Sequence, residues 1–599
     1  MESCLSALRT KVMPSQQTHS DIAIKWGSLT LLRVQKDKNN QRHQTTSGPL
    51  TNHESDHNPT LNGPSSAASS TGLSSNSLVS NPSIHADIAD EGNPIPTSPS
   101  SSKQRARRIN RSDTSSSAVS SAVGNGDHIL DSYEDAEERF LEEHDSYFLH
   151  LGTDNVRRDQ YPKLELQRLV YLDYATCPLY SLYQVEQHMQ ILLDSAGPCS
   201  GVFPTADNLP ANSKTYIDST SRRLLDIFHV TEEDYTVIFA PGLSSCYRIF
   251  GEMHPFQKGD LLLISPDAHE CVRYAVQASS LHGSKTEPMP IRNTDMCIDA
   301  NALRKRLKMQ SWSGRGHVLL IYPAQSHSSG IRHSLNWIAE AQQNGWKVLL
   351  DVATSIPMVN VDLSLYQPEF IVGSFHHILG YPSNIGFLLI RRNSHSIYNP
   401  KGSAGFKIAE APDKGRHYHV MTEGENWSIH KFAALSFGLE HFETIGLTAI
   451  WERVESLLAW VVDAFKSLKH KSGQKPLVQI YGSLDLKYRG SMLAFNVLDS
   501  TGDVFPAGLV QGLAKRDDIF LGIVRLGNPE LYHLLQQKSH RSDLCDASIN
   551  DLRAVRLSLG PVSTFEDVYR LAQFLTHFRD EDYAALQAVG YVEGYTEDP

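Results

Sequence analysis

The feature that most constrains the fold is a series of short apolar runs separated by amphipathic helical segments. Several of these runs are continuous and rich in Val, Ile and Leu: "GHVLLIYPA", "WKVLLDVA", "PEFIVGSF" and "IGFLLIRR". Such runs are typical of strands that are buried on both faces of a sheet. A helical segment, "NWIAEAQQNG", lies between the first two. This alternation predicts an α/β fold with a mostly parallel sheet and right-handed crossovers.

Composition separates a tail from the rest of the 599-residue chain. Residues 1–127 lack periodic apolar patterns, and from Ser47 to Val123 the sequence is dominated by Ser, Asn, Pro and Gly. Such a segment cannot bury enough apolar surface to offset its ordering entropy, so we expect a disordered tail. Residues 128–168 carry one helical pattern, "DSYEDAEERFLEEHDSYFLHL", which leads into the folded body.

The folded body divides into two expected domains. Residues 169–445 hold the alternating strands and helices and end with a long helix, "SIHKFAALSFGLEHFETIG". Residues 446–599 are expected to form a smaller α+β domain, with "SMLAFNVLD" and "RAVRLSLG" as strands. The last helix of this domain is expected to open with a capping box made by Ser563 and Glu566.

Bulk composition excludes several classes of function. The net charge is −12 and the basic run "KQRARRINR" stands alone, so we expect no nucleic-acid partner. The apolar runs are far shorter than the ~20 residues that span a bilayer, so we expect no membrane insertion. The seven cysteines are scattered without a CxxC pair, which indicates a reducing compartment and no metal site. We expect a cytoplasmic protein, and the N-terminal tail leaves nuclear or organellar targeting open.

Polar side chains follow the apolar runs where parallel strands would end, which is where α/β sheets place their chemistry. After "YTVIFA", Gly242, Ser244 and Ser245 form a strand-to-helix turn that could hold a phosphate. His269 follows "LLLIS", and Gln325 follows "VLLIYPA". Each feature is weak alone, because most such turns bind nothing and a lone histidine is more often a satisfied surface or core residue.

Asp351 ends the buried run "WKVLLD". A buried carboxylate is costly unless it has a cationic partner or hydrogen bonds. Asp351 is therefore either a helix cap or the counter-ion of a bound cation.

Taken in order, these motifs resemble a known family. The stretches that carry the resemblance are "YLDYATCPLYS", "YPAQSHSSGIRHSLNWI", "VLLDVATSIPMVNVDLS" and "FIVGSFHHILGYPSNIGFLLIRR". The region from about Val170 to Asp580 is similar to the class V aminotransferases, and within them to the molybdenum cofactor sulfurase branch. The resemblance implies a fold-type-I pyridoxal-phosphate transferase: a large domain with a mostly parallel sheet flanked by helices, a smaller C-terminal α+β domain, and a homodimer with sites near the subunit interface.

The resemblance implies a role for each matching residue. His269 resembles the histidine that stacks on the pyridine ring, and Asp351 resembles the carboxylate that pairs with the ring nitrogen. Arg556 resembles the arginine that clamps a substrate carboxylate; the alternative is a strand-end arginine paired on the surface. The other expected cofactor contacts are Gly242, Ser244 and Ser245 at the phosphate turn, Gln325 after its strand, and Ser374 and His376 as a second phosphate contact.

The sequence also departs from the family pattern. His377 stands at the position of the lysine that forms the Schiff base, and imidazole cannot form that bond. The stretch "VRLGNPELYH" lacks the persulfide cysteine; Cys545, the nearest thiol after Arg525, is interpreted as a loop cysteine. No Thr follows Gly424 to supply the family's phosphate contact from the partner subunit, and His327 stands where an asparagine is usual. We expect no counterpart of the C-terminal domain that binds the molybdenum cofactor in full-length sulfurases.

Three functions remain open at this point. The first is a degenerate family member, a pseudoenzyme that binds pyridoxal phosphate or another small phosphorylated ligand non-covalently. The second is an active pyridoxal-phosphate-dependent sulfurtransferase or cysteine desulfurase-type enzyme that works without the usual lysine. The third is a scaffold protein with an empty pocket. The retained Asp351, His269 and Ser374 favour an occupied pocket, whereas the missing lysine favours the pseudoenzyme, and no residue is assigned a catalytic role.

Overall fold

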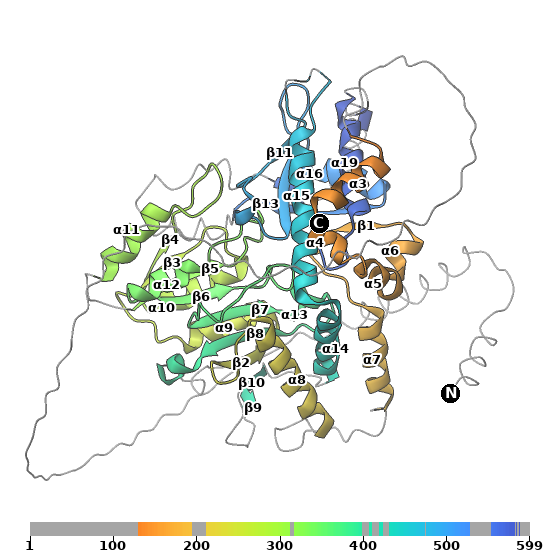
Figure 1. The fold of residues 1–599 in the computed structure, drawn as a ribbon. Coiled ribbons are helices and arrows are strands. Elements are labelled where there is room, and N and C mark those ends of the chain that lie inside the picture. Colours follow the sequence, from red (N-terminus) through yellow and green to blue (C-terminus); the bar gives the residue numbers. More distant parts are fainter. Residues whose placement is uncertain are drawn as a thin grey trace, which may run out of the picture. The chain divides into compact units, whose positions relative to one another are not determined.

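The structure is a computed structural model, and its chain divides into two units, Met1–Ala118 and Val119–Pro599. All the residues it describes belong to the second unit (Figure 1). The described residues are 130–194, 211–311, 317–397, 407–409, 418–422, 430–471, 473, 475–527, 553–580, 583 and 586–587. The expected disordered tail, residues 1–127, therefore lies outside the described residues, and the lead-in is described from residue 130.

The larger sheet of the described residues has nine strands (Figure 1). In spatial order they are β4 (Lys285–Pro288), β3 (Leu261–Ile264), β5 (Val318–Pro323), β6 (Lys347–Asp351), β7 (Phe370–Ser374), β8 (Gly386–Arg391), β2 (Tyr235–Ala240), β10 (Tyr418–Thr422) and β9 (Lys407–Ala409). The strands from β4 to β7 are parallel, and β8 runs antiparallel to both of its neighbours. The mostly parallel sheet and the strands predicted in it are confirmed.

Alternate residues of these strands pack into two different hydrophobic cores, which explains why the runs are continuously apolar. Ile238 of β2 packs with helix residues such as Phe250, whereas its neighbours Val237 and Phe239 pack with Leu435 on the other face. The helices around the sheet are α7 (Leu182–Asp194), α8 (Ala211–Ile227), α9 (Gly242–Met253), α10 (Arg273–Leu281), α11 (Ala300–Ser311), α12 (Asn336–Gln343) and α14 (His430–Ile445). Both faces of the sheet are therefore covered.

A second sheet lies in the C-terminal part and contains five described strands. In spatial order they are β1 (Val170–Leu172), β13 (Ile519–Arg525), β14 (Arg553–Ser558), β12 (Met492–Val497) and β11 (Val478–Ile480). Strand β1 pairs with β13 through Val170 and Ile519. The smaller sheet therefore has an edge strand that comes from the start of residues 169–445, the region assigned to the large domain. Its helices are α15 (Leu447–Ser467), α16 (Ala507–Arg516) and α19 (Phe565–Thr576).

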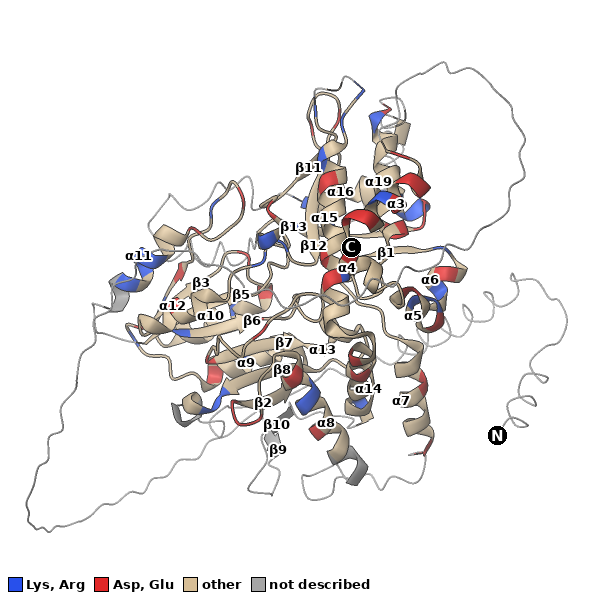
Figure 2. Ribbon diagram, viewed as in Figure 1, with Lys and Arg blue, Asp and Glu red and all other residues tan. Residues whose placement is uncertain are grey.

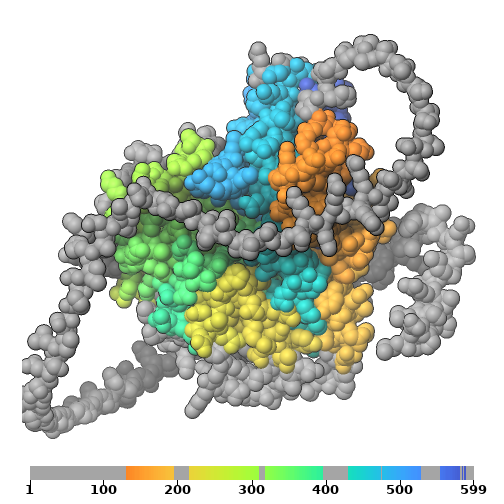
Figure 3. All heavy atoms as spheres, viewed as in Figure 1, coloured from red at the N-terminus to blue at the C-terminus, as the bar shows by residue number. Residues whose placement is uncertain are grey.

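The lead-in to the body is helical, and it consists of a series of short helices. They are α3 (Tyr133–Glu143), α4 (Asp145–Leu149), α5 (Thr153–Gln160) and α6 (Pro162–Leu166). His144 separates the first two because its backbone, at φ −124° and ψ 70°, is not helical. Phe140 of α3 stacks on Phe565 of α19, with ring centroids 4.6 Å apart. Figure 3 shows this lead-in, in orange, against the cyan and blue C-terminal part.

The predicted capping box of the last helix was one residue too early. Thr564 and Asp567 make the reciprocal cap of α19. Ser563 is occupied elsewhere, because its hydroxyl accepts a hydrogen bond from the Gly560 N–H at 2.9 Å. The prediction recognised the capping pattern but could not tell which of two adjacent hydroxyls would face the helix.

The described surface carries both signs of charge. Figure 2 shows Lys and Arg interspersed with Asp and Glu along the described elements. None of the described helices is long and apolar enough to cross a bilayer, and no described group of His, Cys, Asp and Glu side chains is placed to hold a metal ion.

Candidate functional site

The predicted site residues of the larger sheet gather at one of its edges. Strands β3, β5, β6 and β7 are parallel, so their carboxyl ends meet there. Strand β2 points the same way, because it and β7 both run antiparallel to β8. The residues at or after these strand ends include Gly242, Ser244, Ser245, His269, Gln325, His327, Asp351, Ser374, His376 and His377.

Asp351 is a buried carboxylate at the end of β6. Its Oδ2 accepts a hydrogen bond from the Tyr247 hydroxyl at 2.7 Å, and its Oδ1 accepts one from the Ala353 N–H at 2.9 Å. Burial raises the pKa of Asp351, and the nearby His269 ring acts in the opposite sense. Two hydrogen bonds leave lone pairs on this carboxylate free, so it retains the capacity to pair with a bound cation.

His269 lies at the start of a short 3-10 helix, η1 (Glu270–Val272), directly after β3. Its Nδ1 accepts a hydrogen bond from the Cys271 N–H at 3.2 Å, so the neutral ring carries its proton on Nε2. The ring centroid of His269 lies 5.3 Å from that of His327 and 6.1 Å from that of His377. Histidines from three different strand ends therefore meet at this place.

Ser374 ends β7 and begins the short helix α13 (Phe375–Leu379). Its hydroxyl accepts a hydrogen bond from the His376 N–H at 3.3 Å, which makes Ser374 the N-cap of α13. This cap fixes the direction in which α13 presents its two histidines, whose ring centroids are 5.5 Å apart.

His377 is held neutral by its surroundings. Burial lowers its pKa to about 4, and the ring of His269 and other basic neighbours act in the same direction. A hydrogen bond with the backbone of Ala175 acts in the opposite sense. The Nδ1 atom of His377 is buried and has no hydrogen-bond partner. A buried nitrogen without a partner is unfavourable, so this atom marks a place where a ligand atom would be stabilising.

Arg556 of β14 reaches this edge from the smaller sheet. Only 2% of the residue is exposed, which excludes a surface strand-end arginine. Its Nη1 donates to the His327 carbonyl at 3.1 Å and contacts His327 Nε2 at 3.3 Å. Its Nη2 donates to the Thr176 hydroxyl at 2.6 Å and to Asp173 Oδ1 at 3.3 Å. The Nε of Arg556 is buried without a partner, so one N–H of the guanidinium remains unused.

Gln325 is engaged within the protein. Its Nε2 donates to the Thr354 carbonyl, and its Oε1 accepts from the Ser491 N–H, each at 2.7 Å. The adjacent Gly490 is required here, because a Cβ on it would lie 1.5 Å from Gln325 Oε1. Gln325 therefore links the loop after β5 to the start of β12, and a cofactor contact would have to share or replace these bonds.

The turn between β2 and α9 places Gly242, Ser244 and Ser245 at the first turn of the helix. Gly242 adopts φ +74°, a conformation that favours glycine. Pro241 precedes the helix without a side-chain cap, so it leaves the first N–H groups of α9 available to an anion. The hydroxyl of Ser244 lies 3.3 Å from the Cys271 sulfur, close to the loop that carries His269.

Two supporting groups were not found from the sequence. Asp267 Oδ2 lies 2.9 Å from His333 Nε2, and both side chains are largely buried. Asp267 precedes His269, and His333 closes the loop that carries His327, so this pair holds the two loops together. Tyr247, the donor to Asp351, was also missed. Nothing in the sequence distinguishes these residues from ordinary core and loop positions.

A cavity of about 480 Å³ opens beside the histidines. It is lined by Asp267, Ala268, His269, Glu270, His327 and Ser328 after β3 and β5, and by Ile523, Val524, Arg525 and Gly527 at the end of β13. The volume is within the range of small-molecule sites. The predicted Gly424 and Cys545 positions, and the stretch after Gly527, lie outside the described residues.

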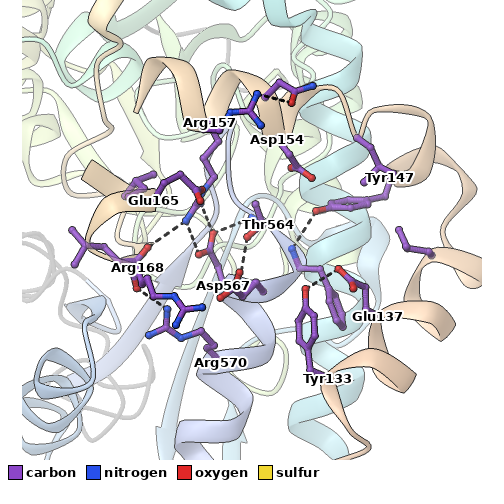
Figure 4. A pocket seen from close by; sticks show the side chains of 18 residues that line it. Tyr133, Glu137, Tyr147, Asp154, Arg157, Glu165, Arg168, Thr564, Asp567 and Arg570 are labelled. Atoms are coloured by element: carbon purple, nitrogen blue, oxygen red, sulfur yellow. Dashed lines mark hydrogen bonds and ion pairs between the residues drawn. The ribbon is translucent and has the colours of Figure 1, made fainter. Parts of the chain in front are cut away.

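Another cavity, of about 370 Å³, lies between the lead-in helices and α19 (Figure 4). At its centre Arg157 donates to both oxygens of Asp567, at 2.7 and 3.0 Å. The same guanidinium also donates to Glu165 and to the carbonyls of Val562 and Leu169. Every nitrogen of this guanidinium has a partner within the protein. The cavity is therefore a structural junction between the lead-in helices and α19.

The chain is similar in sequence to curated proteins. Molybdenum cofactor sulfurases match at 26% identity in Arabidopsis thaliana and 28% in Bos taurus, over 73% and 68% of this chain. The chain spans 60% and 50% of those two proteins.

Three solved structures share the fold. A cysteine desulfurase from Thermococcus onnurineus has a TM-score of 0.55 and 19% identity, over 70% of this chain and 96% of that one. A cysteine desulfurase from Escherichia coli has a TM-score of 0.54 and 17% identity, over 72% and 98%. A C-DES variant with glycine covalently linked to its pyridoxal phosphate has a TM-score of 0.52 and 16% identity, over 70% and 98%. The family model named Aminotransferase class-V matches residues 206–571, and the chain therefore belongs to the aminotransferase class-V family.

Proposed function

We propose that this chain is a degenerate, molybdenum cofactor sulfurase-like member of its family that binds pyridoxal phosphate non-covalently and does not turn over a substrate. The observation that carries the proposal is His377. It stands where the family resemblance places the Schiff-base lysine, next to His269, with a buried Nδ1 that has no partner. An imidazole cannot form the Schiff base, yet His269 and Asp351 are still present at the positions that the resemblance assigns to other cofactor contacts.

The residues present fit pyridoxal phosphate. The Asp351 carboxylate has free lone pairs, and the first turn of α9 offers backbone N–H groups without a side-chain cap. One buried nitrogen each of His377, His327 and Arg556 has no partner. When bound, pyridoxal phosphate supplies an electron-accepting ring. Asp351 would hold the proton of the ring nitrogen, and the turn at Gly242 would hold the phosphate.

The described thiols give no support for a sulfur-transfer step. A persulfide carrier needs a reactive thiolate, which requires a lowered pKa. Burial instead raises the pKa of Cys177 and Cys297, raises that of Cys271 to about 11, and raises that of Cys246 well above its ordinary value. The described part of the chain therefore offers no activated thiol near the histidines.

The homodimer implied by the resemblance is part of this proposal. Helix α7 exposes Leu182, Met189 and Leu193, of which 40%, 54% and 61% are accessible. Their spacing of seven and four residues places them on one helix face. An apolar face of this kind is suited to a second copy of the chain.

Binding and turnover can be measured separately. We expect saturable binding of pyridoxal phosphate in equilibrium dialysis, complete release on gel filtration, and no sulfide release from cysteine. Sulfide release at an enzymatic rate would instead establish the active sulfurtransferase. Absence of saturable binding would establish the scaffold with an empty pocket. Native mass spectrometry of the freshly purified chain would identify any ligand that accompanies it.

A further inference from the structure

Two imidazole rings line the cavity of about 480 Å³, and hydrogen-bond geometry fixes the position of the proton on each. His269 and His327 both belong to the lining, with ring centroids 5.3 Å apart. His269 Nδ1 accepts a hydrogen bond from the Cys271 N–H, so its proton lies on Nε2. Within the described part of the chain this Nε2 has no hydrogen-bond partner.

Arg556 fixes the tautomer of His327. A guanidinium can only donate, so His327 Nε2, 3.3 Å from Arg556 Nη1, is the acceptor and carries no proton. The proton of this ring therefore lies on Nδ1, which is buried and has no partner. Arg556 does not line the cavity itself. Its charge polarises the imidazole from the Nε2 side and makes the Nδ1–H a stronger donor. The cavity thus has two imidazole N–H donors without an acceptor.

Arg525, at the end of β13, adds a positive charge to the same lining. Its guanidinium makes no ion pair and no side-chain hydrogen bond with the described residues. Two carboxylates also belong to the lining. Asp267 is engaged by His333 at 2.9 Å, whereas Glu270 is exposed and is not paired with Arg525. One guanidinium and two N–H donors therefore lack an anionic partner.

The rest of the lining indicates what kind of anion fits. Ala268, Ile523 and Val524 form an apolar part of the wall. A phosphate monoester carries nearly two negative charges at pH 7, and it would meet one cation and the exposed Glu270. A carboxylate carries one charge and matches the planar fork of an arginine. A short apolar chain ending in a carboxylate suits both parts of the wall.

We infer that this cavity binds a small organic carboxylate, with Arg525 as its charge partner and the N–H groups of His269 and His327 as hydrogen-bond donors. The inference goes beyond the proposed function, because the cavity lining includes neither Asp351 nor the turn at Gly242. The carboxylate site is therefore expected to be occupied with or without the cofactor.

The test is titration of the purified chain with butyrate, followed by ligand-observed NMR, with butyramide as the neutral counterpart. We expect butyrate to bind at least about tenfold more tightly than butyramide, because charge-assisted hydrogen bonds are made only to the anion. Equal binding of the two compounds, or no binding of butyrate, would overturn the inference.

Variants assign the charge to its residue. Arg525 is exposed, so Arg525→Met should leave the fold intact and weaken butyrate about fivefold or more. Arg158→Met, an equally exposed change outside the cavity, is the matched control and should leave the affinity unchanged. Glu270→Gln removes a repelling charge and should strengthen binding. Undiminished affinity in Arg525→Met would contradict the site.

The histidine is tested by a pair of variants that are compared after both are shown to unfold cooperatively. His327→Asn keeps a side-chain N–H donor and should retain more affinity for butyrate than His327→Leu, which has none. Equal affinities in the two variants would remove His327 from the site.

Two further titrations separate this site from other anions and from the cofactor. Inorganic phosphate that binds more tightly than butyrate, and loses affinity in Arg525→Met, would overturn the carboxylate assignment. Butyrate should bind equally well with saturating pyridoxal phosphate; competition between the two would make the cavity the cofactor's own site and overturn the inference. A chain that binds butyrate and not pyridoxal phosphate would refute the proposed function and leave the carboxylate site standing.

Discussion

At the scale of single residues, Asp351 and His377 are the two positions on which the proposed function depends. Asp351 is a buried carboxylate with a hydroxyl and a backbone donor, whereas His377 is an imidazole at the position that the sequence resemblance assigns to the family's lysine. A lysine there would bring a nucleophilic amine that donates hydrogen bonds. An imidazole does not form a Schiff base. In the proposed function, His377 therefore removes the covalent anchor of the cofactor.

Asp351→Asn tests the retained half of the site. The substitution keeps the shape but removes the negative charge that would pair with a protonated ring nitrogen. We expect cofactor binding to weaken by about 1–3 kcal/mol, the range for a lost charge-assisted hydrogen bond. Isothermal titration measures the change. Tyr247→Phe is the matched control, because it removes one partner of Asp351 and leaves the carboxylate, so its effect should be smaller. Unchanged affinity in Asp351→Asn would make Asp351 a structural cap.

At the scale of elements, the lead-in helices are fastened to α19 by the buried pair of Arg157 and Asp567 (Figure 4). Removing one member of a buried pair leaves the other charge uncompensated, which typically costs about 3–5 kcal/mol. We expect Arg157→Met to lower the free energy of unfolding by this amount in urea titrations. Arg158→Met, on the same helix, removes an exposed pair with Asp159 and an exposed hydrogen bond to Asn155, and should cost less than about 0.5 kcal/mol. Equal losses in both variants would contradict the role of the buried pair.

The strands could be predicted from the sequence, whereas the hydrogen-bond partners of individual side chains could not. A strand such as β6 can be recognised from a run of apolar residues, because both of its faces are buried. The capping box moved by one residue because Ser563 bonds to Gly560, a contact that only the folded chain shows. For the same reason the sequence placed Gln325 near the site but could not show that its amide is shared with Ser491.

At the scale of the whole molecule, buried neutral histidines make stability depend on pH. Burial lowers the pKa of His377 and of His441 to about 4 and that of His254 to about 3, from an ordinary value of 6.5. Between these values the unfolded chain binds more protons, so the stability present above pH 6.5 is lost as the pH falls toward 4. Each such histidine should cost about 2 kcal/mol between about pH 7 and pH 5.

Urea unfolding at the two pH values checks this expectation. His441→Gln should remove about 2 kcal/mol of the loss on acidification, because glutamine does not titrate. Tyr161→Phe is the matched control: it removes the hydroxyl that lies 3.1 Å from His441 Nε2 and leaves the titrating ring in place. A stability that does not change with pH, or a His441→Gln variant with the full loss, would show that the ring is not buried in its neutral form.

The central claim is that the pocket holds its cofactor without a covalent bond, and the most direct measurement is the covalent state of bound pyridoxal phosphate. The chain is saturated with pyridoxal phosphate, reduced with borohydride and mapped by peptide mass spectrometry, with His377→Lys treated in parallel. The account predicts no stoichiometric pyridoxyl group on the unmodified chain, and one on the peptide containing position 377 in the variant. A stoichiometric pyridoxyl group on any lysine of the unmodified chain would contradict it and would identify a substitute anchor.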